Sequence, residues 1–245
     1  MGPSRRGYSE RVTLPFVLLP SLGRTATDFD GLVAALRAAG FDALALDPPT
    51  ELPENSTLHE LAQLVIDVLD ERGWDRVHLI GHAFGQRVAR CVVADHSLRV
   101  ATLTMLAGGG LLRIDQSIVE SLIACFDGSL SPDEHLRHVE RVFFAPGNDP
   151  SVWVSGFVPA AAAVQLAAVR ATPHGEWSSA AAGRVLVVQG LQDACSVPEN
   201  GRRYLAMHPG RTTLVEIDGA GNALLPERPD EVAAAVIAFL CAGPE

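Results

Sequence analysis

Short apolar runs alternate along the chain with longer segments whose apolar residues recur at a helical period. The short runs are typical of buried β-strands. They lie at 16–19, 41–46, 77–80, 101–106, 185–188 and 213–217. The longer segments predict helices at 27–39, 57–72, 86–95, 198–207 and 231–240. Gly40 is placed to end the first of these helices, and Ser56 or Thr57 to cap the second.

Strands that alternate with helices predict an α/β fold in which a mostly parallel, twisted sheet carries helices on both faces. The stretch 111–183 departs from this pattern, because it offers helices at 114–126, 132–144 and 160–169 and no convincing strand. We expect it to be a helical lid over the carboxyl edge of the sheet, where open α/β sheets bind ligands. The expected division is a core of 12–110 and 184–241 and a lid of 111–183.

A glycine-flanked turn joins the third predicted strand to its helix. Residues 81–85 read Gly-His-Ala-Phe-Gly. A turn of this kind, G-x-S-x-G between strand and helix, displays the nucleophilic serine of many hydrolases. Here the central residue is Ala83.

From residue 16 to residue 240 the chain resembles the α/β-hydrolase fold. In that fold the triad runs in the order nucleophile, acid, histidine. By resemblance, Asp193 stands at the acid position after the strand 185–188, and Asn222 stands where the histidine is usual. Segments 82–89, 143–150 and 220–229 resemble a bacterial subgroup in which Gly-His-Ala-Phe-Gly replaces the usual turn. That subgroup usually keeps its histidine, so Asn222 departs from it too.

The two replaced positions change the chemistry that this site can perform. Alanine offers no nucleophile, and an asparagine amide cannot take a proton at neutral pH. Asn222 can donate a hydrogen bond to the Asp193 carboxylate, so the pair is expected to be hydrogen-bonded without relaying protons. Asp193 itself is a candidate general base, since burial under a lid would raise its pKa.

Other groups complete the candidate site. The resemblance implies an oxyanion hole made by the backbone amides of Phe84 and of Leu22, which follows Ser21. Arg24 is a candidate ligand for a substrate carboxylate, although a surface pair with Asp28 or Asp30 is the simpler interpretation. Trp153 and Phe157, with Trp177, are expected to line the cavity or to pack the lid helices.

Composition excludes several classes of partner. The 245 residues carry a formal net charge of −10, which argues against nucleic acid and anionic membranes. The sequence offers no metal-ligand spacing and no phosphate-binding fingerprint, so we expect no metal and no cofactor. Residues 1–11 and the broken apolar stretch 12–19 do not resemble a signal peptide or a membrane span, and a cytoplasmic location follows by default. A small-molecule ligand is the expected partner, and a homodimer stays open.

Three hypotheses for function follow. The first is an enzyme that acts on a small, largely apolar carbonyl compound without a serine nucleophile, as a lyase, cyclase or decarboxylase, or by assisted hydrolysis of a labile substrate. The second is a hydrolase relative that binds a ligand or partner without turnover. The third is a serine hydrolase that carries inactivating substitutions at 83 and 222.

Overall fold

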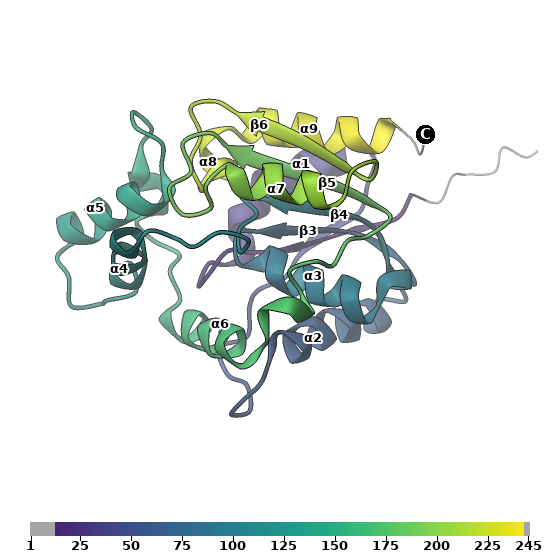
Figure 1. Ribbon diagram of the computed structural model, residues 1–245, viewed down its shortest axis with the longest axis horizontal. Helices are drawn as coiled ribbons and strands as arrows, with labels where there is room; N and C mark the ends of the chain where they lie inside the picture. Colours follow the sequence, from purple (N-terminus) through teal and green to yellow (C-terminus); the bar gives the residue numbers. More distant parts are fainter. Residues whose placement is uncertain (1–12, 243–245) are drawn as a thin grey trace, which may run out of the picture.

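Parallel strands lie in the order β2-β1-β3-β4-β5-β6 in the computed structural model, which describes residues 13–242 (Figure 1). Every pairing between neighbouring strands is parallel. The bounds are β1 Phe16–Leu19, β2 Ala43–Ala45, β3 Val77–His82, β4 Val100–Leu106, β5 Arg184–Gly190 and β6 Thr212–Ile217. The predicted α/β fold with a parallel sheet is confirmed.

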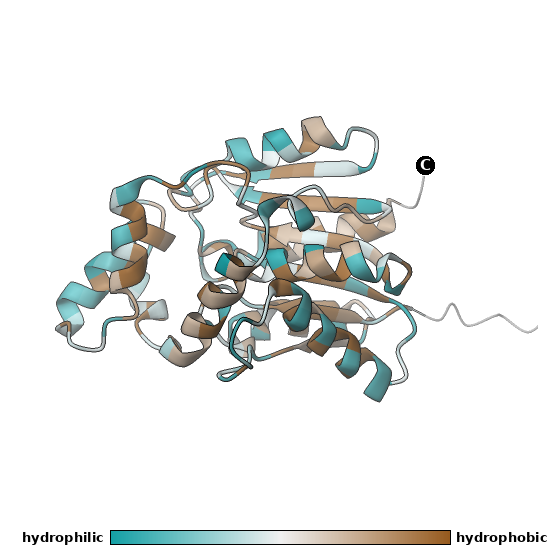
Figure 2. Cartoon of the chain, turned by 60° about the horizontal axis from the view of Figure 1, so that its bottom comes forward, coloured by the Kyte–Doolittle hydropathy of each residue, from teal (hydrophilic) through white to brown (hydrophobic). Residues whose placement is uncertain are grey.

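Successive side chains of the strands pack alternately into two separate apolar cores. In β5, Val185 and Val187 belong to one core, whereas Leu186 and Val188 belong to the other. This alternation follows from the two-residue period of a strand, and both sets are apolar because helices cover both faces of the sheet. Figure 2 shows the resulting hydrophobic strands between helices whose hydrophilic residues face outward.

Helices divide between the two faces according to these cores. One face packs α1 (Asp30–Ala38), α8 (Leu224–Glu227) and α9 (Pro229–Cys241). The other packs α2 (Leu58–Glu71), α3 (Gly85–Asp95) and α7 (Glu199–Met207). Thr57 caps α2 in a capping box with Glu60, which agrees with one of the two predicted caps.

Some predicted boundaries were wrong. The strand expected at 41–46 is reduced to β2, because the backbone N–H of Phe41 donates to Leu36 O and so completes the end of α1. The helix expected from residue 27 begins as a short 3-10 helix, Ala26–Phe29, before α1 starts at Asp30. The third strand continues past Ile80 to His82, which brings the strand up to the turn at Ala83.

Between β4 and β5 the chain forms helices only, within the described residues. These are α4 (Gln116–Ala124), α5 (Pro132–Phe143) and α6 (Pro159–Ala171), with short 3-10 helices at Pro150–Trp153 and His174–Glu176. In Figure 1, α4 and α5 lie beyond one end of the sheet, and α6 lies near α2. Helices α4 and α5 share an apolar cluster with Trp153, apart from the two cores of the sheet. The function of this segment as a lid stays a prediction.

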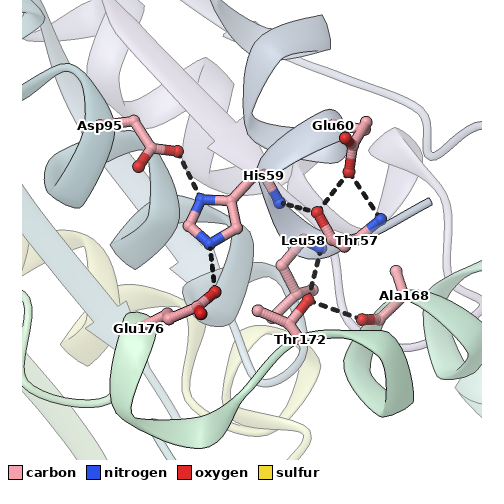
Figure 3. A network of polar contacts seen from close by, with 8 residues as sticks. All are labelled: Thr57, Leu58, His59, Glu60, Asp95, Ala168, Thr172 and Glu176. Carbon is pink, nitrogen blue, oxygen red and sulfur yellow. Dashed lines mark hydrogen bonds and ion pairs between the residues drawn. The ribbon is translucent and has the colours of Figure 1, made fainter. Parts of the chain in front are cut away.

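Polar contacts attach the end of this segment to the core (Figure 3). The Leu58 N–H at the start of α2 donates to Thr172 Oγ1 at 2.8 Å. His59 reaches Asp95 Oδ2 at 2.6 Å through Nδ1 and Glu176 Oε2 at 3.0 Å through Nε2. The imidazole therefore links α2, the end of α3 and the segment that leads into β5.

The predictions made for residues 1–11, and residue 12 of the expected core, lie outside the described residues. Within 13–242, no helix combines the length and the apolar character that crossing a membrane requires.

Candidate active site

The turn after β3 holds a non-glycine residue in the left-handed region. Ala83 has a φ of 45°, and its N–H donates to Leu106 O at 2.8 Å. A Cβ on Gly81 would lie 2.4 Å from Gln86 Cα, and one on Gly85 would lie 2.2 Å from Leu19 O. Both glycines are therefore required by close backbone contacts. The turn has the sharp, strained strand-to-helix geometry of a nucleophile elbow.

A cavity of about 390 Å³ opens at this turn. Ala83 and Phe84 lie in its wall, together with Asn222 and with residues of α4 and α6. Most of the remaining wall is apolar, and no Asp or Glu lines it within the described residues. The lining comprises Ser21, Leu22, Ala83, Phe84, Gln86, Arg87, Gly109, Gly110, Leu112, Ile114, Val119, Leu122, Phe143, Leu166, Val169, Thr172, His174, Trp177, Cys195, Ser196 and Asn222.

Two backbone amides at the cavity are without a partner. Leu22 and Phe84 both line the cavity, and neither N–H donates a hydrogen bond to any described residue. The loop that carries Leu22 is held from α6, because the Gly23 N–H donates to Gln165 Oε1 at 2.6 Å. Phe84 stands at the N-terminus of α3, where free N–H groups and the helix dipole favour negative charge.

Asp193 and Asn222 meet as the sequence predicts. Asn222 Nδ2 donates to Asp193 Oδ2 at 3.0 Å, and Gln189 Nε2 donates to the same oxygen at 3.2 Å. The backbone N–H groups of Cys195 and Ser196 donate to Oδ1 at 2.9 and 2.6 Å. Burial raises the pKa of Asp193 to about 7, although these hydrogen bonds oppose the shift.

Asp193 is nevertheless separated from the cavity. Its carboxylate accepts four protein hydrogen bonds, and it is absent from the cavity wall, whereas Asn222 is present there. The hypothesis that Asp193 takes a proton directly from a substrate gains no support from this arrangement. The carboxylate instead fixes the orientation of the Asn222 amide.

The loop that carries Asn222 is anchored on several sides. His82 Nε2 donates to Asn222 O at 2.8 Å, and the Gly221 N–H donates to Glu227 Oε2 at 2.7 Å. The next residue, Ala223, donates its N–H to Phe143 O at the end of α5 at 2.8 Å. The loop that carries Asn222 is therefore held in place between the sheet and α5.

Three predicted site residues lie elsewhere. Arg24 is not free to bind a substrate, because its Nε and Nη2 donate to Asp28 at 2.8 and 2.6 Å. Its guanidinium lies over the rings of Trp153 and Phe157, at 4.4 and 4.7 Å from their centroids. Neither aromatic residue lines the cavity at the turn. Both pack the lid helices around a buried ion pair, which was one of the two interpretations of these aromatic residues.

Arg87 is a wall residue that the sequence analysis missed. It lies in the first turn of α3, four residues after Ala83, and its guanidinium faces the rings of Trp177 and Phe84 at 5.3 and 6.0 Å. The side chain forms no hydrogen bond and no ion pair with the described residues. Burial lowers its pKa. Its place in the first turn of the helix that follows the glycine-flanked turn was the available signal.

The one thiol in the wall is poorly suited to act as a nucleophile. Burial raises the pKa of Cys195 to about 12, so the thiol stays protonated at neutral pH. Among residues 13–242, no three His, Cys, Asp or Glu side chains gather as a metal site would require.

The fold and the strained turn are those of α/β proteins that build their sites at the carboxyl edge of a parallel sheet. The family model described as "Alpha/beta hydrolase family" matches residues 16–235. The chain therefore belongs to the alpha/beta hydrolase family.

Known proteins resemble this chain at different levels. A proposed carbamate hydrolase, RutD, from Variovorax paradoxus is 33% identical over 97 residues, which cover 37% of this chain and 36% of that protein. The chain thus matches little more than a third of the length of this curated relative. A proposed non-heme bromoperoxidase, BpoC, from Mycobacterium tuberculosis has a TM-score of 0.78 at 19% identity, with 94% and 92% of the two chains covered. A hydrolase from Pseudomonas aeruginosa has a TM-score of 0.76 at 23% identity, with 96% and 91% covered. At these levels of sequence identity, the structural similarity shows a shared fold and no more.

Proposed function

We propose that this protein is an alpha/beta hydrolase family enzyme that acts without a serine nucleophile on a small, largely apolar compound containing a carbonyl group. The observation that carries the proposal is the strained turn at Ala83, which adjoins a cavity where the Leu22 and Phe84 amides donate no hydrogen bond to residues 13–242. Such amides polarise a carbonyl or stabilise an enolate, and one donor is worth on the order of 3 kcal/mol in the transition state.

The proposed reactions are those that proceed when the enzyme only polarises the carbonyl group of the substrate and holds the substrate in a reactive orientation. Enzymes stripped of a triad keep roughly 10³–10⁴-fold catalysis over water through binding and the oxyanion hole. That range fits elimination, cyclisation, decarboxylation or hydrolysis of an intrinsically labile substrate, and it is too small for a stable ester or amide. In this mechanism Asn222 orients the substrate or a water molecule, and Asp193 positions Asn222.

The first experiment identifies a ligand and then tests for turnover. Purified protein is exposed to cell extract, the retained compound is identified by mass spectrometry, and its conversion is followed with fresh protein. Ala83→Leu fills the space beside the two amides, so binding and conversion should both be lost. Ala163→Leu, at an exposed position of α6, is the matched control and should keep both. Conversion that survives Ala83→Leu would exclude this site.

A second experiment tests the geometry of the turn. Ala83→Ser combined with Asn222→His should produce measurable hydrolysis of an activated ester such as p-nitrophenyl acetate. Adding Asp193→Asn should remove that gain, because the imidazole would lose its orienting carboxylate. A gain that is indifferent to Asp193→Asn would show that the hydrolysis occurs elsewhere.

A binding protein without turnover is the second candidate, and one observation favours it. Asp193 is saturated with hydrogen bonds and lies behind Asn222, while Cys195 stays protonated. Hence neither a carboxylate nor a thiolate is available at the cavity wall to accept a proton. Binding of the retained compound without any conversion would favour this candidate.

A further inference from the structure

The cavity at Ala83 contains a partly buried positive charge without a counter-ion. The Arg87 side chain forms no ion pair and no hydrogen bond within residues 13–242, and its guanidinium faces the rings of Trp177 and Phe84. Two arginines nearby, Arg24 and Arg90, are buried and have protein partners. Arg24 binds Asp28 through two nitrogens, and Arg90 donates to Met105 Sδ and to Ser178 O.

The surroundings of Arg87 add to the positive potential. No carboxylate lines the cavity among the described residues, and the first turn of α3 directs its free N–H groups toward this region. Trp177 Nε1, from another residue of the wall, is buried and has no acceptor. A charge that is partly removed from water gains from a counter-ion, because its desolvation is costly.

We propose that Arg87 binds the carboxylate of an amphipathic monoacid, whose apolar body fills the rest of the cavity. This inference rests on the proposed function only in taking the same cavity as the ligand site. A planar guanidinium matches a planar carboxylate through two parallel hydrogen bonds. The remaining wall supplies Leu112, Ile114, Val119, Leu122, Leu166 and Val169 for the apolar body.

A dianion such as a phosphate monoester fits the site less well. His174 is the other basic side chain of the wall, and its Nε2 already donates to Gly110 O at 2.5 Å. A single guanidinium in a largely apolar wall therefore favours a single negative charge. A neutral compound of equal shape would fill the same cavity but would leave Arg87 without a counter-ion.

The test compares acids with uncharged probes of the same shape. Butanoate, hexanoate and octanoate are each paired with the corresponding primary amide, and binding to the full chain is measured by calorimetry at neutral pH. We expect Kd values for hexanoate and octanoate of about 1 mM or tighter. Each should bind about tenfold more tightly than its amide, and Arg87→Gln should reduce this preference to about twofold or less.

The matched control removes a positive charge from an exposed position beside the cavity. Arg113→Gln changes the net charge by the same amount, and it should keep the preference for acids because Arg113 is exposed and is not in the wall. Equal loss in both variants would indicate a long-range effect of charge and would overturn the proposal. So would equal binding of acid and amide, or the failure of every acid in the series to bind.

Melting temperatures without ligand separate a binding role from a structural one. Arg87→Gln should leave the melting temperature unchanged or raise it, since the guanidinium has no hydrogen bond or ion pair with the described residues to lose. Arg24→Gln should lower it, because Asp28 would stay buried without its partner. A fall for Arg87→Gln as large as that for Arg24→Gln would make Arg87 a structural residue and overturn the proposal.

These outcomes are independent of turnover. Acid binding that depends on Arg87, without conversion of any compound, would support this inference and contradict the proposed enzyme. Conversion of an uncharged compound that is indifferent to Arg87→Gln would support the enzyme and contradict the inference.

Discussion

Ala83 adopts a conformation that its own side chain does not favour. The left-handed region costs an L-residue about 1–2 kcal/mol, and Ala83 has a φ of 45° there. Its backbone is held by the hydrogen bond to Leu106 O and by the close contacts of Gly81 and Gly85. The strain at this residue is therefore imposed by the turn as a whole.

Replacing Ala83 by glycine should relieve that strain. Glycine pays about 0.5–1 kcal/mol of additional backbone entropy on folding, so Ala83→Gly should raise the free energy of unfolding by about 0.5–1 kcal/mol. Urea denaturation measures the change. Ala89→Gly, inside α3, should have the opposite sign, because that position is helical and buried. A loss of stability in Ala83→Gly would contradict the argument.

His78 should titrate well below the usual range of histidine. Burial lowers its pKa to about 4, and the charges of Arg76 and Arg184 add to the shift. Because the unfolded chain protonates near pH 6.5, the stability contributed by neutral His78 is present above that pH and is lost as pH falls toward about 4. Two-dimensional NMR of the imidazole measures the midpoint. A midpoint near 6.5 would show that the ring is solvated.

At the scale of elements, His59 links the segment before β5 to the core. Both of its ring nitrogens donate to carboxylates, which requires the imidazolium (Figure 3). The hydrogen bond that His59 donates to Asp95 is the largest cause that raises the pKa of His59, and the hydrogen bond to Glu176 adds to it. The attachment of α2 to the segment before β5 therefore depends on pH.

The sign of that dependence can be measured. A raised pKa means that the stabilisation is fully present below pH 6.5 and is lost as pH rises through the pKa of the folded protein. The difference in unfolding free energy between the wild type and His59→Gln should shrink over that rise. Glu176→Gln removes the carboxylate on the lid side, and a double-mutant cycle with His59→Gln should show coupling only at the lower pH.

The elements that the sequence predicts well are those with a clear period. The strands and the helices of the core follow from alternation and helical spacing, and the chain order after β5 and β6 brings Asp193 to Asn222. The start of β2 was misjudged because the Phe41 N–H bonds back to α1 rather than to a neighbouring strand. This hydrogen bond depends on the folded arrangement of the chain, and the local pattern of apolar and polar residues does not indicate it.

The lid residues were harder to place from sequence. Arg24 precedes Trp153 and Phe157 by more than a hundred positions, and nothing local indicates that these aromatic rings cover its ion pair with Asp28. Arg87 was overlooked for a related reason. Arg87 is notable because its guanidinium has no counter-ion among the described residues. The absence of a counter-ion can be recognised only when the positions of all neighbouring residues are known.

At the scale of the whole molecule, burial controls the reactivity of the cysteines. Cys91 and Cys125 are buried, Cys195 is partly exposed at the cavity wall, and Cys241 is exposed at the end of α9. Burial raises the pKa of the first three to about 12. Thiolate, the reactive form, is therefore scarce at these three positions in the folded protein.

Ellman's reagent should accordingly modify only Cys241 quickly in the native protein at mildly alkaline pH. Denaturant should release the other three thiols, and Cys241→Ser should remove the fast phase. Fast modification of Cys195 in the native protein would show that the cavity opens widely to solvent.

The strained turn also has a consequence at the level of the gene. A serine codon lies a single nucleotide away from an alanine codon, and a histidine codon lies a single nucleotide away from an asparagine codon. Ala83 keeps the left-handed backbone of the turn, and Asn222 is hydrogen-bonded to Asp193. The gain of ester hydrolysis proposed for Ala83→Ser with Asn222→His therefore requires only two single-nucleotide changes.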